Sequence, residues 1–196
     1  MGRQSNASER RDQIIWALYD CLVEKGHEKV TIKEIAKKAG LPSGVIHYYF
    51  KSKDEIVSKL AAAIIEKYTY EIQDLLKDAT SSEQKIMLTI DFVIDRLIFN
   101  LPLNRVFFNL IQMAFERTAL NSVVKDMFEN YRKQLSEIFQ AAGAGDKSQM
   151  LGASLVAVTE GFSLQFMVDP QAFDHDDVRE IITKEIHDRL DLKKTD

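Results

Sequence analysis

The residues with the most distinctive side-chain chemistry lie in the segment TIKEIAKKAGLPSGVIHYYFKSK, residues 31–53. The segment contains five lysines and, in succession, His47, Tyr48 and Tyr49. Lysine ammonium groups bind phosphates, and polar side chains on a short helix can reach base edges in a DNA groove. Two short helical patterns meet at AGLPSG, where Gly40 can adopt a positive φ. This spacing predicts a helix-turn-helix that binds nucleic acid.

The rest of the chain offers little that could support catalysis or metal binding. It has no P-loop, no dinucleotide-binding fingerprint and no G-x-S-x-G nucleophile motif. Cys21 is the only cysteine, which excludes an intramolecular disulfide and a cysteine-based metal cluster. The acidic run DHDD at residues 174–177 is better explained as a helix start, where carboxylates favour the helix dipole. We therefore expect no enzyme activity, no metal site and no cofactor.

Length and charge are compatible with a protein whose N-terminal part contacts nucleic acid. The 196 residues suit one ordinary domain or two small domains that share a core. Residues 1–60 carry 11 Lys and Arg against 8 Asp and Glu, whereas the remaining residues carry 15 against 22. We find no apolar run long enough to span a bilayer and no signal peptide at the polar start. The expectation is a cytoplasmic protein with no membrane partner.

Hydrophobic periodicity predicts an all-α protein of about nine helices. Thr31 with Glu34, and Ser52 with Glu55, have the spacing of capping boxes, and Asp146 and Asp174 are candidate caps of later helices. Pro42, Pro102 and Pro170 are expected to separate helices. The expected helices are 8–26, 31–40, 42–50, 52–77, 82–100, 104–116, 120–142, 146–168 and 174–191.

The run IIWALYDCLVEKGHEKVTIKEIAKKAGLPSGVIHYYFKSKDEI resembles the N-terminal domain of TetR/AcrR-family transcriptional regulators. The resemblance implies a three-helix DNA-binding domain over residues 1–53. It also implies a helical effector-binding and dimerisation domain over residues 54–196. In this arrangement Ile35, Ala36, Ile46 and Phe50 would form the core of the helix-turn-helix.

The resemblance also implies roles for individual residues on DNA. The residues expected to read bases in the major groove are Ser43, Gly44, Val45 and His47. The residues expected to hold phosphates are Thr31, Tyr49 and Lys53, and Lys33 could contact either phosphates or bases. For Tyr48 two interpretations stay open, because an aromatic ring at this spacing could contact DNA or pack against the first and fourth helices.

Aromatic and methionine side chains are abundant on the middle helices, next to polar positions, and this favours an effector cavity. The candidate walls are Phe99, Phe107, Ile111, Met127, Phe128, Tyr131, Phe162 and Phe166. The candidate groups for a polar end of the ligand are Asn109, Gln112 and Glu160. The alternative interpretation of the same residues is a plain packed core.

The segment 146–168 is apolar nearly all round, which predicts burial on more than one side. One side would belong to the chain's own core and the other to a second subunit, paired with the last helix in a four-helix interface. The candidate interface residues are Gly152, Leu155, Val156, Thr159, Ser163, Ile182 and Ile186.

These patterns together favour a homodimeric DNA-binding repressor that a small, largely apolar ligand releases from a pseudo-palindromic operator in double-stranded DNA. The alternative is a helical small-molecule-binding protein or enzyme in which the N-terminal helix pair is only structural. Binding to duplex DNA with a steep salt dependence separates the two hypotheses.

Overall fold

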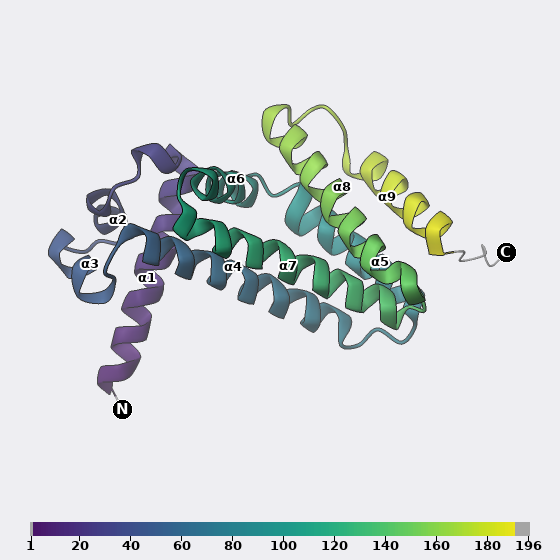
Figure 1. Cartoon of the computed structure of the whole chain (residues 1–196), viewed down its shortest axis with the longest axis horizontal. Coiled ribbons are helices and arrows are strands. Elements are labelled where there is room, and N and C mark those ends of the chain that lie inside the picture. The colour runs from purple at the N-terminus through teal and green to yellow at the C-terminus, as the bar shows by residue number, and fades with distance from the viewer. Residues whose placement is uncertain (1, 191–196) are drawn as a thin grey trace. The chain divides into compact units, whose positions relative to one another are not determined.

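The computed structural model describes the backbone of residues 2–190 and the side chains of residues 7–189. Within this range the chain forms nine α-helices and no β-strand (Figure 1), which confirms the all-α prediction. The helices are α1 (Gly2–Lys25), α2 (Ile32–Lys38), α3 (Ser43–Tyr49), α4 (Lys53–Leu76), α5 (Ser82–Phe92), α6 (Leu101–Glu116), α7 (Thr118–Ala141), α8 (Ser148–Val168) and α9 (His175–Leu190). Residue 191, the predicted end of the last helix, lies outside the described residues.

The helix starts are fixed by side-chain caps at three of the four predicted positions. Thr31, Ser52 and Asp174 each accept a hydrogen bond from the backbone N–H three residues later, at 3.2, 3.1 and 2.9 Å. Asp146 was expected to cap α8, and this prediction is wrong. It lies inside a 3₁₀ turn, η3 (Gly145–Lys147), and α8 begins only after it, without a side-chain cap.

The connection between α5 and α6 differs from the sequence prediction at both ends. The helix predicted over residues 82–100 ends at Phe92 and continues as a π-helical turn, η2 (Val93–Ile98). Pro102 does not separate helices but lies in the first turn of α6. A proline fits there because the first backbone N–H groups of a helix have no partner within it.

The chain divides into two compact units. The N-terminal unit comprises Met1–Ile65 with Arg105–Met127, and the C-terminal unit comprises Glu66–Asn104 with Phe128–Asp196. Helices α4, α6 and α7 therefore each contribute residues to both units. The sequence predicts a different division, into a DNA-binding domain over residues 1–53 and an effector-binding and dimerisation domain over residues 54–196. This division by function stays a prediction.

The N-terminal unit is built on the buried face of α1. Ile14 and Leu18 have no exposed surface and Leu22 is 1% exposed, and α2 packs directly on α1. This spacing of four residues matches one face of a helix. The other fully buried large side chains of the unit include Ile35, Ile46, Phe50, Ile56 and Leu60.

The C-terminal unit has its own apolar core from α5, η2, α7, α8 and α9. α8 and α9 lie next to each other in Figure 1, and both contact η2. Helices α7 and α8 approach closely at Gly152, where an added Cβ would stand 2.9 Å from two backbone atoms of α7. The buried core residues include Ile86, Ile90, Ile94, Ile98, Leu135, Phe139, Leu151, Leu155, Val178, Ile182 and Ile186.

One segment among the described residues, Gly145–Val168, is long and apolar enough to cross a membrane by length and composition. The sequence-based expectation that no segment has this property is therefore wrong. A single such helix is weak evidence for a membrane span, because core helices of soluble proteins also have this composition.

Candidate nucleic-acid interface and effector site

The turn between α2 and α3 is held by backbone geometry and by α1. Gly40 has a backbone angle φ of 65°, which residues with a Cβ atom rarely adopt. The N–H of Leu41 donates to the carbonyl of Ala36 at 2.9 Å, which closes the end of α2. The side-chain amide of Gln13 on α1 donates to the carbonyl of Ala39 at 2.6 Å. The helix-turn-helix is therefore fixed to the first helix at its turn.

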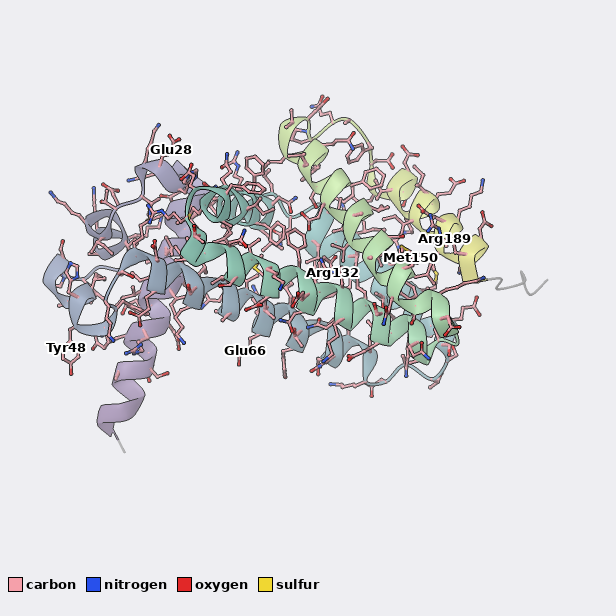
Figure 2. The ribbon with its side chains drawn as sticks, viewed as in Figure 1. Glu28, Tyr48, Glu66, Arg132, Met150 and Arg189 are labelled. Atoms are coloured by element: carbon pink, nitrogen blue, oxygen red, sulfur yellow. The ribbon has the colours of Figure 1, made fainter. Side chains whose placement is uncertain are left out.

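Helix α3 buries one face and exposes the other. Ile46 is fully buried and Phe50, which follows the last turn, is 2% exposed. The side chain of Tyr48 is 82% exposed and projects away from the ribbon (Figure 2). This exposure excludes the interpretation that Tyr48 packs in the core. Ser43, Gly44 and His47 are also exposed, and Val45 and Tyr49 are half-buried.

The predicted phosphate-binding residues lie in different environments. Thr31 and Lys33, at the start of α2, are exposed. Lys53 is half-buried, and its ammonium donates to the carbonyl of His27 at 2.9 Å and to that of Val30 at 2.5 Å. Burial lowers the pKa of the Lys53 ammonium, and Arg117 adds to this effect. Two of its three N–H groups are used inside the protein, so a phosphate could be reached only by the third.

His27, between α1 and α2, is held from several sides. Its backbone N–H donates to Oδ1 of Asn109 at 2.6 Å, and its ring Nδ1 lies 3.1 Å from the same oxygen. Its Nε2 lies 3.3 Å from a carboxylate oxygen of Glu116. The amide nitrogen of Asn109 donates to the carbonyl of Arg105 at 2.7 Å. Asn109 was predicted to fix the polar end of a ligand, but its amide instead joins α6 to the end of α1.

The candidate effector residues are divided between the two units. The N-terminal unit contains Phe107, Asn109, Ile111, Gln112 and Met127. The C-terminal unit contains Phe99, Phe128, Tyr131, Glu160, Phe162 and Phe166. In the C-terminal unit the structure brings part of the predicted set into direct contact.

An aromatic cluster occupies the region where η2, α8 and the start of α9 meet. The ring of Phe99 lies 4.9 Å from that of Phe166 and stacks on His175 at 3.7 Å between centroids. Phe162 contacts Phe173 edge to face at 5.0 Å. The sequence analysis missed Phe173 and His175. A signal for Phe173 was available, because it directly precedes the cap residue Asp174. An apolar residue at this position often packs on the helix that follows.

Glu160 is the only candidate ligand residue in the described C-terminal unit that carries a carboxyl group. Its side chain is half-buried on α8, and within residues 7–189 no hydrogen bond or ion pair reaches it. Burial raises the pKa of Glu160 to about 7. Burial raises the pKa of the nearby phenol of Tyr131, and the charge of Glu160 adds to this effect. The hydroxyl of Tyr131 donates to Oγ1 of Thr159 at 3.3 Å. The site thus combines a phenol with a partly protonated carboxyl group.

The residues predicted for the dimer interface lie inside the single chain, with exposed fractions below 9%, so they could contribute little to a contact between subunits. Gly152 packs on Arg132 and Ser136 of α7, and Thr159 donates to the carbonyl of Leu155 at 2.7 Å. This correction applies to Gly152, Leu155, Val156, Thr159, Ser163, Ile182 and Ile186.

Comparisons with known families match both parts of the chain. Residues 14–60 match the model of bacterial regulatory proteins of the tetR family. Residues 82–191, more than half of the chain, match the C-terminal domain of BetI-type transcriptional repressors. The chain belongs to the TetR family. It is a DNA-binding transcriptional regulator with a ligand-binding domain, and this confirms the resemblance drawn from residues 14–56.

Two distant relatives of this TetR-family chain cover it almost completely. It is 26% identical over 197 residues to the HTH-type transcriptional regulator PksA of Bacillus subtilis, covering 95% of this chain and 92% of PksA. It is 23% identical over 193 residues to the nicotine-responsive transcriptional repressor HdnoR of Paenarthrobacter nicotinovorans, covering 94% and 97%. These relatives are transcriptional regulators and not enzymes, which disfavours the alternative of a helical enzyme.

The fold has close counterparts among solved structures. A TetR transcription regulator from Haloarcula marismortui superposes with a TM-score of 0.80 at 19% identity, covering 94% of this chain and 98% of that one. At this identity the likeness concerns the fold alone.

Proposed function

We propose that this TetR-family chain is a homodimeric repressor that binds a pseudo-palindromic operator and leaves it when a small ligand binds the C-terminal unit. The observation that carries the proposal is the exposed face of α3. Its polar residues, His47 among them, have no role in the core, while Ile46 anchors the helix. A short helix held in this way is suited to the major groove. A cytoplasmic location is part of this proposal, since a repressor must reach its operator.

Selection of bound duplexes from a random library tests the operator. The enriched sequence is expected to be pseudo-palindromic, with half-site centres roughly 34–36 Å apart. His47→Ala is expected to change the preferred bases, whereas His175→Ala, in the C-terminal unit, should leave them unchanged. An unchanged preference in the His47 variant would remove this residue from base readout.

The dimer interface is proposed on the exposed face of α8 and α9. Met150, Leu164 and Val168 are 67%, 48% and 79% exposed, and Ile181 on α9 is 52% exposed. Ala157 and Gly161 are exposed on the same face of α8. The spacing 150, 157, 161, 164, 168 follows one side of a helix, and its small residues would let two helices approach closely. An apolar helix face of this length is better covered by a second copy than by water.

Light scattering of two charge variants tests this interface. Leu164→Arg is expected to give monomers and to lose most operator affinity, because a single DNA-binding unit makes half the phosphate contacts. The matched variant Tyr70→Arg, at an apolar residue of α4 that is 69% exposed, should remain dimeric. A dimeric Leu164→Arg protein would place the interface elsewhere.

The effector is proposed to be a small, largely apolar molecule whose polar end carries a basic nitrogen. An unpaired, half-buried carboxyl group favours a cationic group over an anionic one, since the cation restores the charged form that burial disfavours. Aromatic rings close to such a site also attract cations. The relative HdnoR is named as responsive to nicotine, which carries a basic nitrogen.

Thermal shifts with matched probes test this ligand class. A library of arylalkyl amines should raise the melting temperature more than the corresponding carboxylic acids. Amine binding should tighten as the pH rises through about 7, because the carboxyl group of Glu160 must be ionised to pair with the amine. Glu160→Gln should abolish the preference for amines, and an amine preference that survives in this variant would refute the assignment.

Release from DNA is proposed to pass through α6, which contributes residues to both units. Its Asn109 holds the backbone of His27 at the end of α1, so a displacement of α6 would reach the DNA-binding helices. A coupling of about 1–3 kcal/mol is sufficient, and it must be reciprocal. Calorimetric titration of an active amine with and without operator should show weaker binding with operator. Equal affinities would mean that the bound ligand is not an inducer.

A further inference from the structure

Two arginines on α1 lie beside the helix-turn-helix but outside it. Arg10 and Arg11 are both exposed. Arg10 lies four residues before Ile14, and Arg11 lies four residues before Ile15, so both continue the buried face of α1 beyond the core. They therefore lie on the side of α1 against which α2 packs.

Each arginine is positioned by a contact that leads to the helix-turn-helix. The guanidinium of Arg11 lies over the ring of Phe50, 5.3 Å from its centroid, directly after the last turn of α3. The guanidinium of Arg10 donates to the side-chain oxygen of Gln13 at 2.6 Å. Gln13 in turn donates to the carbonyl of Ala39 at the turn between α2 and α3. Arg11 therefore lies at the end of α3, and Arg10 is linked through Gln13 to the turn between α2 and α3.

The acidic residues of the same stretch point elsewhere. Glu9 and Asp12 lie about 100° further round α1 from Arg10 and Arg11, on the sides away from the buried face. The basic side of these turns therefore lies next to the helix-turn-helix, at Phe50 and, through Gln13, at Ala39. A guanidinium has five N–H donors, so the contacts to Gln13 and Phe50 leave donors free for phosphate oxygens.

We propose that Arg10 and Arg11 form an additional phosphate-binding surface on α1, which contacts the duplex backbone next to the groove occupied by α3. This inference rests on the proposed DNA-binding function. It adds two contacts per subunit that strengthen binding to any sequence without changing which sequence is preferred.

Salt titration of DNA affinity tests the proposal with a 30-bp duplex of mixed sequence and with the selected operator. Arg11→Ala removes one phosphate contact in each subunit, so the slope of log K against log salt should fall by about 1.8 per dimer. The advantage of the wild type over the variant should accordingly be about tenfold smaller at 200 mM salt than at 50 mM. Arg10→Ala should behave in the same way, and Arg11→Lys should keep most of the slope.

Two comparisons separate this result from its alternatives. Lys184→Ala removes one positive charge from an exposed position on α9 and should leave the slope unchanged. The inference is overturned if Arg11→Ala lowers the melting temperature and the affinity but not the salt slope, and Arg10→Ala changes neither the affinity nor the slope. The arginines would then only support packing. In that case DNA binding by the wild type still stands, whereas a wild type that binds neither duplex overturns the proposed function itself.

Discussion

Replacing Gly152 with alanine is expected to destabilise the protein by about 1 kcal/mol net. The new Cβ would stand 2.5 Å from Oγ of Ser136 and 2.9 Å from both the carbonyl oxygen of Arg132 and the backbone nitrogen of Ser136. Side-chain rotation could relieve only the first contact, because the other two involve the backbone of α7. Overpacking of this kind costs about 1–3 kcal/mol, and the higher helix propensity of alanine offsets about 1 kcal/mol.

Urea unfolding followed by circular dichroism measures this difference, with Gly44→Ala as the matched control. A Cβ at Gly44 meets no atom within 4 Å, so that variant should be unchanged or slightly more stable. The two variants should differ by about 2 kcal/mol, and Gly152→Ala should lower the melting temperature by about 2–4 °C. Adding Ser136→Ala should restore only part of the loss. A Gly152→Ala protein as stable as the control would refute the close approach of α7 and α8.

Three further predictions concern the sites. Asn109→Ala should cost about 1–3 kcal/mol of unfolding free energy in urea titration, because it leaves the backbone N–H of His27 without its acceptor. The free energy of unfolding should fall as the pH rises from about 4.5 to 7, because the folded chain keeps a proton on Glu160 that the unfolded chain has lost. In unfolding curves measured in parallel, Glu160→Gln should remove this part of the pH dependence. Lys53→Ala should lower the melting temperature by several degrees, because its ammonium binds two carbonyls, and should change the salt slope of DNA binding less than Arg11→Ala.

The amino-acid sequence by itself determined the all-α fold, three helix caps and the helix-turn-helix. These features depend on neighbours in the chain: Thr31 caps α2 through an N–H three residues away, and Gly40 closes a turn through its own backbone angle. The resemblance to the TetR/AcrR family implied that Ile35, Ala36, Ile46 and Phe50 are buried, and the structure confirms it. The same resemblance implied that His47 faces outward, and His47 is exposed on α3.

Only the tertiary structure decided which side of each apolar helix is covered. α8 is apolar nearly all round, so periodicity could not show that Gly152 and Thr159 face α7 while Leu164 remains exposed. The bonds of Asn109 and Lys53 to the backbone before α2 were equally hidden, because the bonded groups lie 82 residues away from Asn109, and 26 and 23 residues away from Lys53. A polar side chain near an apolar helix face looks the same in sequence whether it binds a ligand or a distant backbone group. The choice depends on which segments the fold brings together.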